Sequence, residues 1–221
     1  MARNFVAAFD KNEALLAEKD LLVKEVHHRV KNSLQVVASL VSLQSHRLQD
    51  PGQKAVFQAL RQRITAIALV HEKLYGRAFG GQPDLGEYLL DLVRLQYPGD
   101  GLEPRRVAWD IHVDPLKTGI DDCIDTGLIL TELMSNAHKH GLLPQGGGRL
   151  SVDLRVREGW LVLEVIDDGP GFPAGFQPEA SSGLGFRLIL ALMQRHEGIL
   201  TVLPGTGGRI RVELKILSPP G

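Results

Sequence analysis

The sequence has almost no cysteine, since Cys123 is the only one in the chain. A single thiol cannot form a disulfide within one chain, and the sequence does not open with the charged and then apolar segment of a secretion signal. These two absences exclude a small secreted domain that disulfides hold together. We therefore expect a protein of the reducing cytoplasm.

Long apolar runs and an excess of one charge are missing too. The most apolar stretch, residues 36–43, is interrupted by Ser39 and Ser42 and is far shorter than the ~20 residues of a membrane helix. The 25 Lys and Arg residues are balanced by 26 Asp and Glu residues, and the formal net charge is -1. Because the apolar run is so short, we expect no membrane span in this chain. Because the balanced charges produce no large positive field, we do not expect a nucleic-acid partner.

The first part of the chain has a helical pattern. Of the 221 residues, 43% are hydrophobic, which is enough for one or two domains with a packed core. Helix-forming residues run without Gly or Pro over residues 12–48 and, after a turn at 50–52, over residues 53–75. Each run has one apolar stripe with steps of three and four residues: Val23, Val26, Val30, Leu34, Val37, Val41 and Leu48, then Val56, Leu60, Ile64, Ile67, Val70 and Leu74. This pattern predicts a helical hairpin as a first domain over residues 1–79.

The two apolar stripes need a partner surface. Two helices alone bury little surface, so we predict that the hairpin doubles into a four-helix bundle across a homodimer. The alternative is that the stripes pack against the rest of the same chain, because a stripe does not identify its partner.

The second part of the chain mixes helices and strands. A stretch with Gly and Pro, residues 76–83, predicts a linker, and a second domain follows over residues 84–217. Strand patterns occur at 107–113, 149–157, 160–166, 199–203 and 209–216, and helical patterns at 122–140 and 184–196. These elements predict an α+β sandwich whose helices cover one face of a sheet.

Two adjacent histidines lie in the middle of the first predicted helix. At ~100° per residue, His28 lies ~200° from the stripe residue Val30, whereas His27 lies only ~60° from it, so we expect His28 to be exposed. A neutral imidazole has a lone pair that can attack a phosphoryl group. Asn32 and Glu25, one turn away on the same face, could orient a water molecule and accept the ring proton. Taken alone, two surface histidines are more often simply solvated.

Three polar residues follow one another along the face of a helix in the second domain. Glu132, Asn136 and His140 recur at intervals of four residues. An amide oxygen is a ligand that suits Mg²⁺, which makes Asn136 a candidate metal ligand, and Lys139 can neutralise phosphate charge. The alternative is an ordinary amphipathic helix with a polar face.

Two glycine-containing turns follow this helix. In the first, an apolar strand leads into Asp167, whose carboxylate can accept a hydrogen bond from an adenine amino group, and Gly169 and Gly171 allow the backbone to approach the base.

The second turn opens a helix with Gly183, Leu184 and Gly185, where backbone amides and a helix N-terminus can bind phosphate. Each turn alone is common. The order and spacing of the three segments together indicate a nucleotide site.

These motifs carry a resemblance to a known family. With an HRxxN box at His28, an ELxxNAxKH helix from Glu132, a DDGPG turn and an SGLGF turn, the chain resembles a bacterial sensor histidine kinase over residues 21–214. More narrowly, it is similar to the HRxxN type related to the HWE kinases. The resemblance implies a dimeric helical bundle followed by an ATP-binding α/β sandwich of the GHKL type, named after gyrase, Hsp90, histidine kinases and MutL.

The resemblance also implies residue roles and partners. His28 would be the phosphoacceptor, Asn136 the magnesium ligand, Asp167 the adenine contact, and Glu132 would assist removal of a proton. Residues 172–182 would form a lid over ATP, framed by the glycines at 169, 171, 183 and 185. ATP and Mg²⁺ would be the cofactors, the aspartate of a response-regulator receiver domain would take the phosphoryl group, and a sensor domain or protein would act upstream.

Two other functions compete with this interpretation. A non-catalytic phosphotransfer or scaffold protein would keep the bundle and His28 without binding ATP, but Glu132, Asn136 and Asp167 are all retained. A serine kinase or an ATPase would use only the nucleotide fold, and it would leave the exposed His28 and its neighbour Asn32 unexplained.

Overall fold

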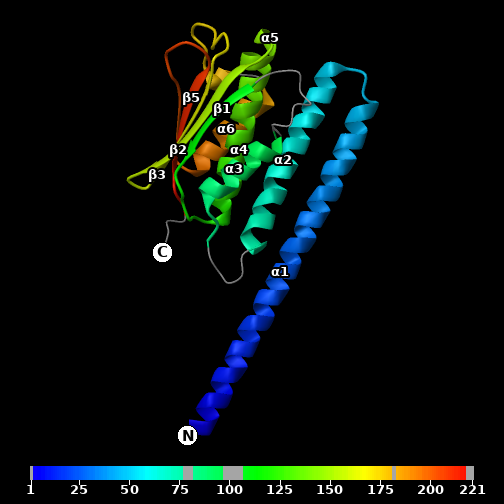
Figure 1. Cartoon of the computed structure of the whole chain (residues 1–221), viewed down its shortest axis with the longest axis vertical. Coiled ribbons are helices and arrows are strands. Elements are labelled where there is room, and N and C mark those ends of the chain that lie inside the picture. The colour runs from blue at the N-terminus through cyan, green and yellow to red at the C-terminus, as the bar shows by residue number, and fades with distance from the viewer. Residues whose placement is uncertain (1, 77–81, 97–106, 181–182, 218–221) are drawn as a thin grey trace.

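A long helical hairpin forms the N-terminal part of the computed structural model, which describes residues 2–76, 82–96, 107–180 and 183–217. Helix α1 (Ala2–Arg47) and helix α2 (Pro51–Gly76) run antiparallel, and α1 projects well beyond the end of α2 (Figure 1). Asp50 caps α2, because its Oδ1 accepts a hydrogen bond from the Gln53 amide at 2.7 Å. The predicted hairpin is confirmed.

A five-stranded sheet with the order β1-β2-β3-β5-β4 forms the other part. The strands are β1 (Val107–Val113), β2 (Gly148–Arg157), β3 (Trp160–Asp167), β4 (Ile199–Val202) and β5 (Arg209–Lys215). Strand β1 pairs with β2 in parallel, and the other pairs are antiparallel. Helices α4 (Ile120–Asn136) and α6 (Leu184–Arg195) lie on one face of the sheet, as predicted (Figure 1).

One helix, α3 (Leu85–Gln96), has no counterpart among the predicted elements. Its Leu85, Leu89 and Leu92 are fully buried at steps of three and four residues, which is the spacing of a core-facing helix. The remaining elements are short: a π-helix (Ala137–Leu142), α5 (Leu143–Gln145) and a 3-10 turn (Pro178–Ala180).

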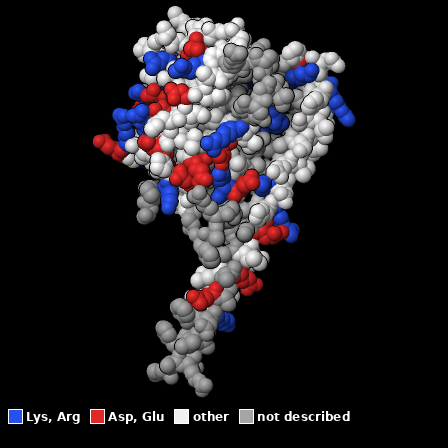
Figure 2. All heavy atoms as spheres, viewed as in Figure 1, with Lys and Arg blue, Asp and Glu red and all other residues white. Residues whose placement is uncertain are grey.

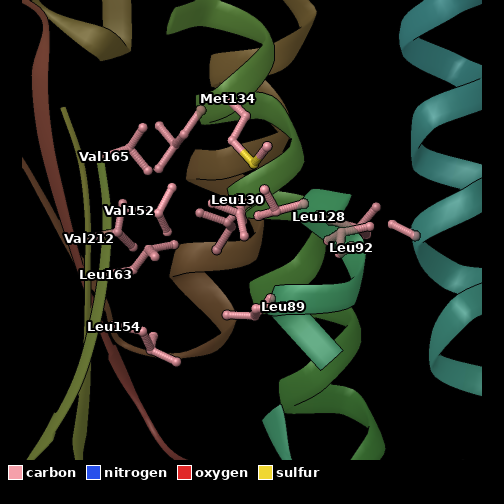
Figure 3. Close-up of a cluster of buried hydrophobic side chains, with 14 of the residues drawn as sticks. Leu89, Leu92, Leu128, Leu130, Met134, Val152, Leu154, Leu163, Val165 and Val212 are labelled. Carbon is pink, nitrogen blue, oxygen red and sulfur yellow. The ribbon is translucent and has the colours of Figure 1, made fainter. Parts of the chain in front are cut away.

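The core lies between the sheet and the helices and continues into the hairpin. Figure 3 shows Val152, Leu163 and Val212 of the sheet pointing toward Leu130 and Met134 of α4.

On the far side of these helices, Ala66 and Val70 of α2 are 0% and 1% exposed and belong to the same core. The Tyr88 hydroxyl of α3 donates a hydrogen bond to the Ala66 carbonyl at 3.1 Å. Helix α2 therefore packs against α1 on one side and against the α/β domain on the other.

The apolar stripes of the hairpin have more than one partner. Val70 enters the core of the α/β domain, so part of the second stripe packs within the chain. Val26, Val37, Val56 and Leu60 stay exposed. The predicted linker lies partly outside the described residues, which omit 77–81.

The surface carries both charges side by side. On the face shown in Figure 2, acidic and basic side chains are interspersed over the α/β domain, as the balanced composition predicts. Among the helices that the structure describes, none is at once long enough and apolar enough to cross a bilayer.

Candidate active site

A cavity of about 480 Å³ lies where the end of α4, the end of β3 and the start of α6 meet. Six residues that the sequence selected line it: Asn136, His140, Asp167, Gly171, Gly183 and Gly185. Apolar and aromatic side chains complete the wall, among them Leu133, Val165, Phe172, Phe176, Phe186 and Ile210. An apolar cavity with a few convergent polar groups is typical of a small-molecule site.

Strand β3 delivers Asp167 to this cavity. Side chains alternate along a strand, and Asp167 continues the buried series of Leu161, Leu163 and Val165. Its Oδ1 accepts hydrogen bonds from the amides of Gly169 at 2.9 Å and Gly208 at 3.2 Å.

Burial raises the pKa of Asp167 above its ordinary value, and the hydrogen bonds from the Gly169 and Gly208 amides partly offset this effect. The carboxylate is thus a fixed acceptor in an apolar cavity, and it suits the exocyclic amine of a flat heterocycle.

Two glycines beside Asp167 were missed by the sequence analysis. A Cβ at Gly141 or at Gly208 would overlap the Asp167 carboxylate, so both positions need glycine for the chain to pack so closely. Gly171 was predicted, and it needs glycine for another reason, because its φ is +77°. Gly169 does not line the cavity, and its amide instead fixes Asp167.

The predicted helix over residues 122–140 changes form in its last turn. It is α-helical as far as Asn136, and a π-helix follows from Ala137 to Leu142. Such segments are frequent at functional sites. His140 still lines the cavity, whereas Lys139 and the exposed Leu184 do not.

The Asn136 amide fits a magnesium site. Its Nδ2 is buried and has no hydrogen-bond partner among the described residues, so the side chain is not committed to a structural contact. Amide oxygens are ligands for Mg²⁺.

Glu132 lies one turn before Asn136, directly behind the start of α6. A Cβ at Gly185 would lie 2.6 Å from Glu132 Oε2 and 3.9 Å from Asn136 Nδ2. The helix N-terminus of α6 and the two polar side chains of α4 therefore meet at one point, where backbone amides can bind phosphate.

The other oxygen of Glu132 is bound by a residue of the hairpin. Arg63 Nε of α2 donates to Glu132 Oε1 at 2.6 Å. No sequence motif pointed to Arg63, because it lies 69 residues away from Glu132 in a different part of the fold.

The two adjacent histidines of α1 are in different surroundings, as helix geometry predicted. His28 is exposed, whereas His27 is half-buried and stacks on His71 of α2. Asn32 is exposed too. Glu25 forms an ion pair with Arg29 at 2.7 Å, so its carboxylate is bound to a neighbour other than His28.

The exposed histidine lies apart from the cavity. His28 is not among the residues that line it. The neighbouring His27 contacts α2 at His71, eight residues beyond Arg63, which corresponds to about 12 Å along the helix axis.

Comparisons with known proteins agree with these features. Residues 25–96 match the HisKA_2 family, described as histidine kinase, and residues 121–218 match the HATPase_c family, described as histidine kinase-, DNA gyrase B-, and HSP90-like ATPase. Sensor histidine kinase PdtaS of Mycobacterium tuberculosis is 32% identical over 195 residues, which cover 85% of this chain and 37% of PdtaS.

Two comparisons involve Erythrobacter litoralis. Its blue-light-activated histidine kinase 2 is 27% identical over 198 residues, which cover 87% of this chain and 56% of that protein. The solved histidine kinase domain of its blue-light-activated kinase EL346 has a TM-score of 0.64 at 27% identity and covers 90% of this chain and 93% of that chain. The chain thus spans less than two thirds of the two curated relatives. A phosphoacceptor-type helical region followed by an ATPase-type domain shows that this chain belongs to the sensor histidine kinases and carries their kinase core.

Proposed function

We propose that this chain is an ATP-dependent protein histidine kinase that phosphorylates His28 and passes the phosphoryl group to an aspartate of a response regulator. The observation that carries the proposal is the cavity, which joins Asn136, Asp167 and the start of α6 in a chain that also presents an exposed histidine on α1.

In the proposal, different residues of the cavity bind different parts of Mg-ATP. Asp167 accepts a hydrogen bond from the adenine amino group. The amides at Gly183 and Gly185 bind the phosphates, and His140, which lines the cavity, adds a hydrogen-bonding group beside them, whereas Lys139 lies outside the lining. A Mg²⁺ ion held by the Asn136 amide oxygen would neutralise phosphate charge.

The chemistry is an in-line displacement followed by a second transfer. A ring nitrogen of His28 uses its lone pair to form a bond to the γ-phosphorus, and the bond to the bridging oxygen breaks, so that ADP leaves with that electron pair. The displaced ring proton passes to Glu132. A carboxylate oxygen of the receiver aspartate then attacks the phosphorus, and the bond to the His28 nitrogen breaks. Asn32 would orient water during dephosphorylation.

We also propose that the chain works as a homodimer. An apolar face of the hairpin remains exposed and includes Leu22, Val26, Val36, Val37, Leu40 and Leu43 of α1 with Val56 and Leu60 of α2. A second copy of the hairpin would cover it in a four-helix bundle. Residues 1–79 would form the dimerising and phosphoacceptor domain and residues 84–217 the ATP-binding domain, although the HisKA_2 match extends to residue 96 and includes α3.

One labelling experiment separates this proposal from its rivals. The protein is incubated with γ-labelled ATP and Mg²⁺, and the product is then treated with acid or with base. We expect a label that acid removes and that His28→Ala abolishes. A phosphotransfer or scaffold protein without ATP binding would take up no label, and a serine kinase would give an acid-stable one. Transfer to a purified receiver domain then tests the partner, with a sensor domain or protein as the proposed input.

A further inference from the structure

The hairpin reaches into the nucleotide site through one buried ion pair. Arg63 of α2 and Glu132 of α4 are 2.6 Å apart, and their side chains are only 16% and 5% exposed. A pair so well shielded from solvent is not an ordinary surface contact, because removing either partner leaves a buried charge without compensation.

The carboxylate of Glu132, which we propose as the proton acceptor, lies beside the proposed phosphate site and is bound by Arg63. Its Oε2 faces the start of α6 beside Gly185, where we place the phosphates, and its Oε1 is bound by Arg63. The carboxylate proposed to take the proton of His28 is therefore held by an arginine of the hairpin.

A second group of contacts holds the same helix further along. Lys73 of α2 forms ion pairs with Asp91 and, at 3.4 Å, with Glu87 of α3. Between the two groups, the Tyr88 hydroxyl binds the Ala66 carbonyl at 3.1 Å. Polar contacts at both ends and a buried centre thus keep α2 against the ATP-binding domain.

The acceptor histidine does not face this interface. His28 is exposed on α1, while its neighbour His27 points to α2 at His71. In the docked arrangement His28 lies outside the cavity, so transfer to His28 of the same chain requires the ATP-binding domain to move from its place on α2.

We propose that the Arg63–Glu132 ion pair is an autoinhibitory clasp. It holds the ATP-binding domain in an arrangement that cannot phosphorylate His28, and it occupies the carboxylate that the reaction needs. Opening of the clasp frees Glu132 and allows the domain to move. This inference depends on the proposed kinase function, so the experiments below are designed to separate the two.

The first experiment removes the arginine charge alone. Arg63→Gln keeps a polar side chain that is shorter than arginine and carries no charge, and we expect the initial rate of His28 labelling to rise about fivefold or more, the lower end of usual coupling between sites. The Kd for ATP, measured by calorimetry, should stay unchanged. Arg61→Gln is the matched control, since Arg61 is an exposed arginine two residues earlier on the same helix, and its rate should equal that of the wild type. An unchanged or slower rate for Arg63→Gln overturns the clasp.

The second experiment locks the docked arrangement away from the site. Lys73→Cys with Asp91→Cys places two thiols across the second contact, and a short cleavable thiol cross-linker joins them. The native Cys123 is buried and is not expected to compete. We expect the locked protein to bind ATP without labelling His28, and cleavage of the linker should restore labelling. Full labelling of the locked protein would show that the docked arrangement is active and would overturn the clasp.

These experiments distinguish a failure of the proposed kinase function from a failure of the proposed clasp. If the wild-type protein and the unlocked variant both take up no label, the proposed kinase function itself is wrong. If both are labelled but neither Arg63→Gln nor the lock changes the rate, the kinase function stands and only the clasp is refuted.

Discussion

His27 of α1 and His71 of α2 lie with their Nδ1 atoms 2.9 Å apart, and their rings stack with centroids 5.2 Å apart. One ring must donate and the other accept, so the pair needs at least one neutral imidazole. Burial lowers the pKa of both rings, and the neighbouring His71 lowers that of His27 further. This contact joins α1 to α2 beside the exposed His28 and gives the two adjacent histidines different surroundings.

Replacement of each histidine should therefore give a different result. His28→Ala should eliminate labelling from ATP with no loss of nucleotide affinity, because His28 does not line the cavity. His27→Ala should still be labelled, but the hairpin should lose about 1–3 kcal/mol because His71 keeps a half-buried ring without its partner. Mass spectrometry at neutral pH locates the phosphoryl group, and thermal unfolding measures the loss. A phosphoryl group on His27 would show that the helix register is wrong.

Replacements of Asp167 and Asn136 should affect ATP binding in different ways. Asp167→Asn replaces one acceptor oxygen by an NH₂ donor, and the Gly169 and Gly208 amides hold the oxygen that remains, so the Kd for ATP should rise by an order of magnitude or more. Asn136→Ala should lose the dependence of ATP binding on Mg²⁺ and most of the labelling, while binding without Mg²⁺ stays close to that of the wild type. Calorimetry with and without Mg²⁺ separates the two variants. Full labelling of either variant would remove the corresponding assignment.

The sequence predicted much of the site because local pattern determines it. Asp167 follows an apolar strand, and the period of two residues places its side chain on the buried face with Val165. Gly183 and Gly185 lie at the start of a helix, where the first backbone amides have no partner within the helix. These properties follow from neighbours in the chain, so sequence alone could identify them.

The contacts that the sequence did not reveal are long-range. Arg63 meets Glu132, and Gly208 meets Asp167, only because α2 docks on α4 and β5 pairs with β3. A stripe on α2 could not show that Val70 packs into the α/β domain, since its periodicity is the same for any partner. The π-helix after Asn136 was missed for a similar reason, because its residues have no distinctive spacing.

Two positions of the α1 stripe should respond differently to a charge. Leu34 lies seven residues after His27, on the face that contacts α2, whereas Val37 is 44% exposed. Val37→Glu should therefore separate a dimer into folded monomers of 24.2 kDa. Leu34→Glu should destabilise the hairpin by several kcal/mol, because it buries a carboxylate without a partner.

Light scattering and thermal unfolding distinguish these outcomes. Exposed Gln35→Glu serves as the control, since it adds the same charge on α1 outside the contact face. A wild-type protein that stays monomeric at all micromolar concentrations would contradict the bundle.

His196 should give the α/β domain a stability that depends on pH. It is buried, and its Nδ1 lies 3.0 Å from the Lys215 carbonyl and its Nε2 3.0 Å from Asp125 Oδ2. Both partners are acceptors, so both ring nitrogens must carry protons. Burial alone would lower the pKa of His196, but the hydrogen bonds to Asp125 and to the Lys215 carbonyl outweigh it and the pKa is raised.

Because the folded protein binds this proton more tightly than the unfolded chain, the stabilisation is fully present below pH ~6.5 and is lost as the pH rises through the raised pKa. His196→Gln should thus be less stable than the wild type by about 1.5–3 kcal/mol at pH 6, and the difference should shrink at higher pH. The exposed His112→Gln is the control and should show no such difference.

The His27 and His71 pair changes stability in the opposite direction, since its lowered pKa values make stability fall as the pH drops below ~6.5. Comparing the stability of the variant with that of the wild type at the same pH cancels this contribution, because both proteins contain the pair. A stability difference that stays constant from pH 6 to 9 would show that His196 is not held as an imidazolium.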